Sequence, residues 1–410
     1  MIYSELTTTE SHRMTPSLST AQSIIHMGRA VTLDEVNSWS DEFSSDVTFE
    51  LTQHSGFSLF AEGMAFAKLR EFQEQTIPIR VRTSFPVRIS KNGEILGDVG
   101  ILAQLFGLAL LECADSVVDA GGNEVRTSLY EALWSFVQRN SGHFGDGKRR
   151  FIAFRDPDYS IPQCLRDEQS GPPFPFPEQF KRVLKNASAA LGVGPGLGEG
   201  FCEERLIEFL YETARNSYEH SRNELNQRAI NGIRGITIEK FIFVHPEDLS
   251  SSRHLPELVR SYVDRIWRYR SRSSRPKPLN LIFAVTVADI GPGIHNTLPP
   301  EGDETPWARL NRAFLPRVSR KPASGDVKRG MGLTNVMSAA RFMNALLFVR
   351  SGALAGYRDF SSGTKPSTGL LFDAWPEPLR GAKGTSLTLI WPIGAHRRFV
   401  KPRRPTSFAV

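Results

Sequence analysis

The segment ETARNSYEHS at residues 212–221 decides how the rest of the chain is interpreted. It lies within residues 206–222, which contain neither Gly nor Pro and carry apolar residues at helical spacing, so the pattern predicts a helix. Residues four apart on a helix are separated by only about 40° around its axis, so Glu212, Asn216 and His220 would share one polar face. A carboxylate, an amide and an imidazole so aligned can hold a hydrated cation and activate a water molecule. Taken alone, the pattern is explained more simply by an ordinary solvated face.

Three further motifs follow this helix in a fixed order. Residues 281–287, LIFAVTV, predict a buried strand that runs directly into DIGPGI at residues 289–294. Residues 328–336, KRGMGLTNV, lead from a loop into a predicted helix, and a Gly-Thr pair at residues 384–385 opens a last strand. The order of the four motifs, on elements of the expected types, is more specific than any one of them.

This ordered set resembles the GHKL superfamily, which contains type II topoisomerase ATPase subunits, heat-shock chaperones of the gyrase class, histidine kinases and mismatch-repair proteins. The resemblance covers about residues 200–392. The form E-x-x-x-N-x-x-x-H is most similar to anti-sigma-factor serine kinases and the sensor kinases with related motifs. It implies a Bergerat fold, an α/β sandwich in which helices cover a mixed sheet and ATP lies between the helices and a mobile lid.

The resemblance implies a role for each residue of the first motif. Asn216 would hold the magnesium ion that bridges the phosphates of ATP, because magnesium keeps most of its waters and needs few protein oxygens. Glu212 would orient or deprotonate the attacking group, with its value in positioning more than in basicity. His220 would approach a phosphate group, or it would only complete the polar helix face.

The second motif and the last strand would bind the base. Asp289, at the end of the buried strand, would accept the adenine amino hydrogen, while Gly291 and Gly293 would let the backbone pass close to the base. Thr385 would support the pocket from the last strand. The alternative is a strand that simply ends in an Asp-x-Gly-Pro-Gly turn.

The third motif would bind the phosphates. Gly330 and Gly332 would free backbone N–H groups at the start of the helix that continues through Leu333, where the helix dipole favours anions. Lys328 and Arg329 stand beside this site and would offset phosphate charge. The Pro-rich residues between the second and third motifs would form the long, irregular lid.

We therefore expect an α+β chain in which a smaller α/β module precedes the GHKL domain. The predicted parts are a loose N-terminal segment (1–40), the α/β module of unknown role (41–158), a Pro/Gly-rich linker (159–199), the ATP-binding domain (200–393) and a basic C-terminal tail (394–410).

Composition narrows the class of protein further. The 410 residues are 40% hydrophobic and 23% charged, as in ordinary globular proteins, and the net charge is +6. The three cysteines include no CxxC pair, which argues against a disulfide framework and against a zinc site. The most apolar stretch, residues 100–114, is too short to span a bilayer, and the N-terminus does not resemble a signal peptide. We therefore expect a cytoplasmic protein without a membrane span.

The basic residues at 246–278 interleave with Trp267 and Tyr269, so they could track a nucleic-acid backbone. An amphipathic helix with a solvated Arg face explains them more simply, and a nucleic-acid partner is less favoured.

Three functions fit these motifs. The first is hydrolysis of Mg-ATP, with Glu212 aligning water. The second is transfer of phosphate to a serine or histidine of a partner protein. The third is an ATP-gated interaction module with little turnover. ATP and Mg²⁺ are common to all three, a protein partner or protein substrate is expected, and homodimer formation is left open.

Overall fold

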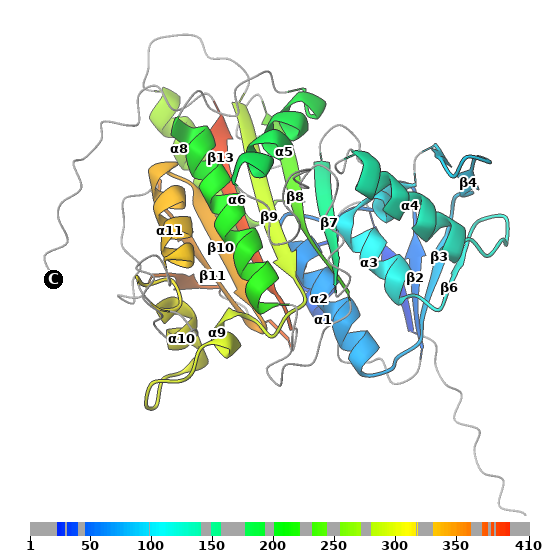
Figure 1. The fold of residues 1–410 in the computed structure, drawn as a ribbon, viewed down its shortest axis with the longest axis horizontal. Coiled ribbons are helices and arrows are strands. Elements are labelled where there is room, and N and C mark those ends of the chain that lie inside the picture. Colours follow the sequence, from blue (N-terminus) through cyan, green and yellow to red (C-terminus); the bar gives the residue numbers. More distant parts are fainter. Residues whose placement is uncertain are drawn as a thin grey trace, which may run out of the picture.

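The described part of the chain consists of two large sheets, a short hairpin and the helices that pack on the sheets (Figure 1). The computed structural model describes residues 23–28, 31–39, 46–97, 99–140, 149–156, 177–192, 201–221, 232–243, 255–271, 280–316, 318, 331–361, 371–375, 379–380 and 383–393. It contains helices together with parallel and antiparallel sheets, which confirms the expected α+β class.

The N-terminal sheet contains four parallel strands in the order β1-β2-β3-β6. Parallel neighbours need crossover connections, and helices supply them here. The elements of this part are β1 (Ser23–Met27), α1 (Leu33–Ser38), β2 (Val47–Leu51), α2 (Ala61–Glu74), β3 (Ile79–Thr83), β4 (Arg88–Ile89), β5 (Ile95–Leu96), the 3₁₀ helix η1 (Gly100–Ala103), α3 (Leu105–Cys113), β6 (Ser116–Val118) and α4 (Arg126–Asn140).

The larger sheet contains seven strands in the order β12-β11-β10-β13-β9-β8-β7. Its elements and the helices around it are β7 (Arg149–Asp156), α5 (Pro177–Ala190), α6 (Phe201–His220), β8 (Gly232–Phe243), α8 (Glu257–Ser271), β9 (Asn280–Asp289), α9 (Ile294–Thr297), α10 (Pro306–Arg312), α11 (Gly332–Phe342), β10 (Leu346–Ser351), β11 (Leu354–Asp359), β12 (Asp373–Ala374) and β13 (Thr385–Ile393).

Every described pairing in the larger sheet is antiparallel. The expectation of a mixed sheet is therefore wrong for this part of the chain. The physical reason lies in the connections, because each hairpin or helical excursion returns the chain against its neighbour. Parallel pairing is confined to the N-terminal sheet among the residues described.

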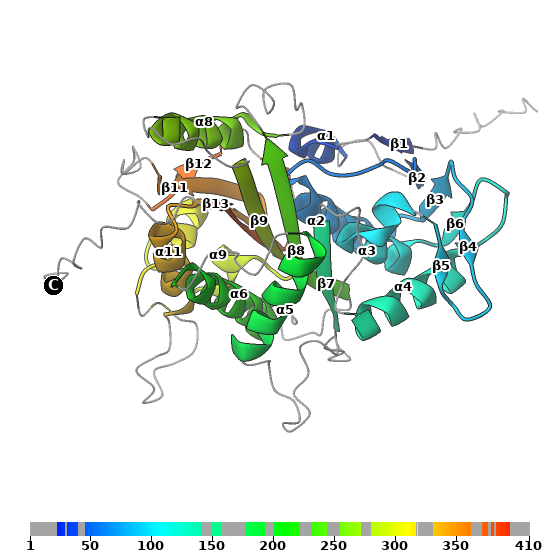
Figure 2. The same cartoon turned by 90° about the horizontal axis from the view of Figure 1, so that it is seen from above.

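Both faces of the larger sheet are buried. The side chains of Phe283, Val285 and Val287 in β9 belong to the core formed with α5, α6 and α11. The alternate residues of β9 belong to the core shared with α2, α3 and α8. Figure 2 shows α6 and α8 on opposite faces of this sheet, and α2 and α3 between the two sheets. The helices of the N-terminal part thus form a layer of the second part as well.

Small residues allow this close packing. Gly235, Ala288 and Ser386 lie side by side on β8, β9 and β13, on the face toward α2 and α3. A Cβ atom on Gly63 of α2 would lie 2.7 Å from the Ser386 Cβ, so a side chain has no room there. Helix α2 therefore rests with its backbone directly on β13.

The structure refines several sequence predictions. Strand β7 falls within the residues assigned to the N-terminal module (41–158), but it pairs with β8 in the larger sheet. The segment expected to be loose before residue 40 contains β1 and also α1, which begins with a capping box between Thr32 and Glu35. The tail at 394–410 lies outside the described residues.

The contact between α2 and β13 predicts a steric cost for Gly63→Ala. The added methyl group meets Ser386, and overpacking of this kind costs about 1–3 kcal/mol, which exceeds the helix-propensity gain of roughly 1 kcal/mol. Urea unfolding should show the loss. Gly28→Ala is the matched control, because its Cβ meets no atom within 4 Å, and it should change stability by no more than about 0.5 kcal/mol. Equal effects of the two substitutions would contradict the packing argument.

Candidate functional site

Helix α6 carries the first motif, as its apolar spacing predicted. Leu206, Phe209 and Leu210 are buried against the larger sheet, which turns the opposite side of the helix outward. Glu212 and Asn216 are half-buried. His220 is half-buried too and ends the helix one turn later. The three residues occupy the shared side that the spacing of four predicts.

The start of α11 meets this polar side of α6. A Cβ atom on Gly332 would lie 3.0 Å from Glu212 Oε2 and 3.3 Å from Asn216 Nδ2. Two motifs that are far apart in the sequence are therefore in contact, and the absence of a side chain at Gly332 allows this close approach. The first N–H groups of a helix have no intrahelical acceptor, so they can bind an anion beside the carboxylate and the amide.

Asn335 completes this cluster, although sequence reasoning gave it no role. Its Nδ2 atom donates a hydrogen bond to Glu212 Oε1 at 3.0 Å, which orients the carboxylate. The signal was present, since Asn335 follows Gly332 by three residues and must lie on the same side of α11.

The Asn216 amide is the other notable group. Its Nδ2 atom is buried, and none of the residues described in the structure pairs with it. Buried polar atoms in folded proteins usually have a partner, and the described residues do not supply one for this Nδ2 atom. No set of three or more His, Cys, Asp or Glu residues that could hold a metal ion is present within the described ranges.

The rest of the third motif is only partly visible. Leu333 is half-buried in the first turn of α11, next to Gly332. Lys328, Arg329 and Gly330 lie outside the described residues. Their predicted contacts with phosphate therefore remain predictions.

A row of polar side chains crosses the larger sheet near the C-terminal end of α6. Asp289 pairs with Thr385, and Thr385 pairs with Ser351. Gly235 pairs with Ala288, so Arg234 lies beside Asp289 on the other side. In each strand these residues alternate with residues whose side chains point toward α2. The polar row therefore lies on the other face of the sheet, which α6 covers. The predicted neighbours Asp289 and Thr385 are thus brought together, while Arg234 and Ser351 were not anticipated.

Asp289 is only 6% exposed, and burial raises the pKa of its carboxyl group to about 6. The Gly291 N–H donates to Asp289 Oδ1 at 2.9 Å, and this bond opposes the rise. The positive charges of Arg350 and Arg234 and the Thr385 N–H oppose it as well. At neutral pH the carboxyl group is therefore mostly ionised although it is buried.

Gly291 connects the polar row with α6. A Cβ atom at this position would lie 2.5 Å from the Ser221 Cα, so only glycine allows the loop after β9 to touch the end of the helix. Asn216 lies five residues earlier, about 8 Å along the helix axis. The polar row and the Glu212 cluster are therefore two ends of one site along α6.

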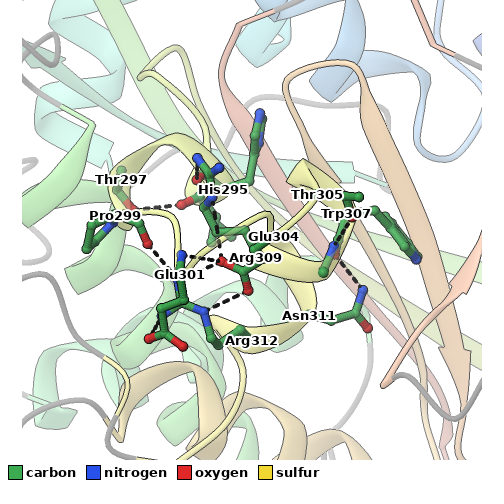
Figure 3. Close-up of polar contacts among 12 residues, drawn as sticks. His295, Thr297, Pro299, Glu301, Glu304, Thr305, Trp307, Arg309, Asn311 and Arg312 are labelled. Atoms are coloured by element: carbon green, nitrogen blue, oxygen red, sulfur yellow. Dashed lines mark hydrogen bonds and ion pairs between the residues drawn. The ribbon is translucent and has the colours of Figure 1, made fainter.

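The first half of the predicted lid is regular rather than irregular. Residues 296–316 include the last two residues of α9 and all of α10. Figure 3 shows Arg309 and Arg312 of this segment directed at Glu304. Arg312 also donates to Glu301 at 2.7 Å and to the Pro299 carbonyl oxygen at 2.6 Å. This network holds the loop between the two helices to α10.

The segment is also tied to the polar row. His295 Nδ1 lies 2.8 Å from Ser351 Oγ. Burial lowers the pKa of His295, and Arg309 lowers it further, so the ring is neutral at pH 7. The second half of the predicted lid, apart from Val318, lies outside the described residues.

The burial of Asp289 predicts a pH dependence of stability. Its pKa in the folded state, about 6, exceeds its ordinary value of 3.8, so the folded state binds this proton more tightly. The free energy of unfolding should therefore fall as pH rises from about 4 to about 6, by on the order of 3 kcal/mol. Asp289→Asn lacks this titration. Urea unfolding at pH 4 and pH 7 gives the free energy of unfolding of both proteins. The value for Asp289→Asn minus the value for the wild type should be larger at pH 7 than at pH 4. An equal difference at the two pH values would contradict the assignment.

Among the described residues, no helix is long and apolar enough to cross a membrane. Comparisons with protein-family models, with known proteins and with solved structures return no match.

Proposed function

We propose that this protein binds Mg-ATP along α6 and hydrolyses it, as a member of the histidine-kinase-like ATPase type. The observation that carries the proposal is the convergence of the separate sequence motifs on one helix. Gly332 touches Glu212 and Asn216 at one end of the site. Gly291, next to the Asp289 carboxylate, touches the other end.

The polar row would bind the base. Adenine presents an amino group, and the buried carboxylate of Asp289 is an acceptor that a neutral donor can reach without competing water. Thr385 lies directly beside it and offers a hydroxyl group that both donates and accepts. Gly291 and Gly293 let the backbone beside the carboxylate pack closely against Ser221 and Ser351.

The Glu212 cluster would bind the phosphates and the metal. Phosphate oxygens would accept hydrogen bonds from the first N–H groups of α11. Asn216 would supply an amide oxygen to magnesium. No described residue accepts a hydrogen bond from its Nδ2 atom, so no such bond holds the amide in another orientation. Magnesium, when bound, would neutralise charge on the phosphate oxygens. This donor set fits the ion, which prefers oxygen ligands and retains waters.

Glu212 is placed to direct the chemistry. Asn335 fixes one carboxylate oxygen, so the other can accept a hydrogen bond from water. That water would attack the terminal phosphorus while the bond to the bridging oxygen breaks, which releases ADP and phosphate. Positioning of the water accounts for most of the carboxylate's effect.

The catalytic role is tested by Glu212→Gln. The amide keeps the size of the side chain but loses the charge that orients the attacking water and the ability to take its proton, so phosphate release from Mg-ATP should fall by roughly 10²–10⁴-fold. ATP binding, measured by calorimetry, should remain. Glu204→Gln on the exposed side of the same helix is the matched control and should keep wild-type turnover. Binding without release by the wild type would favour phosphate transfer to a partner protein or a gating role.

The metal role is tested by Asn216→Ala. Wild-type affinity for ATP should be higher with Mg²⁺ than with EDTA, because the ion bridges protein and phosphate. Removing the amide oxygen should reduce this difference by about tenfold or more, by analogy with the effect of lost ligand-supporting groups. Calorimetric titrations of both proteins, with and without Mg²⁺, give the comparison. A full Mg²⁺ effect in Asn216→Ala would rule the residue out as a ligand.

A further inference from the structure

Arg350, at the end of β10, is a fully buried cation at the junction between the N-terminal part and the candidate site. It alternates with Leu346 and Phe348, which belong to the core shared with α2, so it lies on the face of the sheet opposite to the polar row. Burial lowers the pKa of Arg350 to about 10, and Asp289 opposes this effect. A cation this deep needs a structural or functional reason.

The Arg350 guanidinium joins three segments through their carbonyl oxygens. Nη1 donates to Gly352 at 3.1 Å and to Lys383 at 3.0 Å, and Nη2 donates to Gly63 at 3.3 Å. Gly63 belongs to α2, whereas Gly352 and Lys383 belong to the turns beside the polar row. Arg350 therefore ties a helix of the N-terminal part to both turns.

The two turns border Asp289 directly. The Gly384 N–H, next to Lys383, donates to the Gly291 carbonyl at 2.6 Å, and the Gly352 N–H donates to the Gly384 carbonyl at 2.9 Å. Gly384 has φ +87°, and a Cβ atom there would lie 2.3 Å from the Asp289 carbonyl oxygen and 3.2 Å from Arg350 Nη2. The turns, Asp289 and Arg350 are packed so closely that one cannot shift without the others.

Arg350 and Asp289 also interact electrostatically. Arg350 is the first of two cations that oppose the effect of burial on Asp289, and Arg234 from β8 is the second. The other ionisable groups near these residues come from several elements. Among the described residues they include His295 of α9, which bonds to Ser351; Glu62 of α2, which accepts from Thr237; Lys68 of α2, which pairs with Glu71; Lys383, which pairs with Glu74; and Tyr218 of α6, whose ring lies against Arg234.

We propose that Arg350 is a positioning residue of the nucleotide site, which holds the Gly352 and Lys383 turns beside Asp289, supplies positive charge opposite that carboxylate, and attaches both to α2. This inference rests on the proposed function. It gives the N-terminal part a physical connection to the base end of the site, because a displacement of α2 would break the bond to Gly63 and disturb the turns.

The test compares two conservative variants by calorimetric titration with Mg-ATP between pH 5.5 and 8.5. Arg350→Gln keeps a side-chain donor but loses the charge, and Arg350→Lys keeps the charge. Wild-type affinity should fall as Asp289 is protonated near pH 6. In Arg350→Gln this fall should move to higher pH by on the order of one unit, since a nearby opposite charge holds a carboxylate ionised. In Arg350→Lys the midpoint should stay with that of the wild type, at lower affinity.

Arg80→Met, in the N-terminal sheet, is the control for removal of an arginine and should keep the wild-type profile. The phosphate groups of ATP also titrate in this pH range, but they do so equally for every variant. The test therefore compares the midpoints of the variants with one another. An Arg350→Gln midpoint equal to that of the wild type, with binding retained, would overturn the proposal. The same holds for an Arg350→Lys midpoint that moves with Arg350→Gln.

A second measurement needs no nucleotide. Urea unfolding of Asp289→Asn, Arg350→Gln and the double variant should show non-additive effects at pH 7 that shrink at pH 4, where Asp289 is protonated. Additive effects at both pH values would overturn the role of Arg350. If coupling is present but the wild type binds no ATP at any pH, the proposed function fails, and the inference that depends on it fails too.

Discussion

Strand β9 is buried on both faces, and the rest of the structure depends on this burial. One set of its side chains packs under α6 and α11, and the alternate set packs under α2 and α3. A strand in this position is mostly apolar, and the hydroxyl group of its buried Thr286 is paired with that of Thr388 at 2.8 Å. It can carry an ionisable group only where it ends, and Asp289 stands there. The location of the one carboxylate on this strand within the described core thus follows from the layering of the fold.

The layering also explains why the sheet carries such different residues on its two faces near Asp289. On the α2 face, Gly235, Ala288 and Ser386 are small, because helices rest on them with little space between. On the α6 face, Arg234, Asp289, Thr385 and Ser351 are polar. Burying these groups costs free energy unless they find partners. Their concentration at one end of the sheet is typical of a site that binds something.

The two ends of the site differ in how they are held. The Asp289 end is enclosed by backbone contacts among the glycines of three turns. The Glu212 end is formed by two helices that meet through Gly332, with a half-buried carboxylate and an amide Nδ2 atom that pairs with none of the described residues.

Local patterns in the chain were sufficient to predict α6 and β9, because helical spacing and a continuous apolar run are properties of consecutive residues. They also placed Asp289 at a strand end and Gly332 at a helix start. Long-range packing settled the rest: that β7 joins the larger sheet, that Asn335 holds Glu212, and that Arg234 and Arg350 flank Asp289. Periodicity tells which face of an element is buried but not which element covers it. The Asn335–Glu212 contact joins residues that are 123 positions apart, and the bond from Arg350 to Gly63 joins residues 287 positions apart, so these partners meet only once both cores have formed.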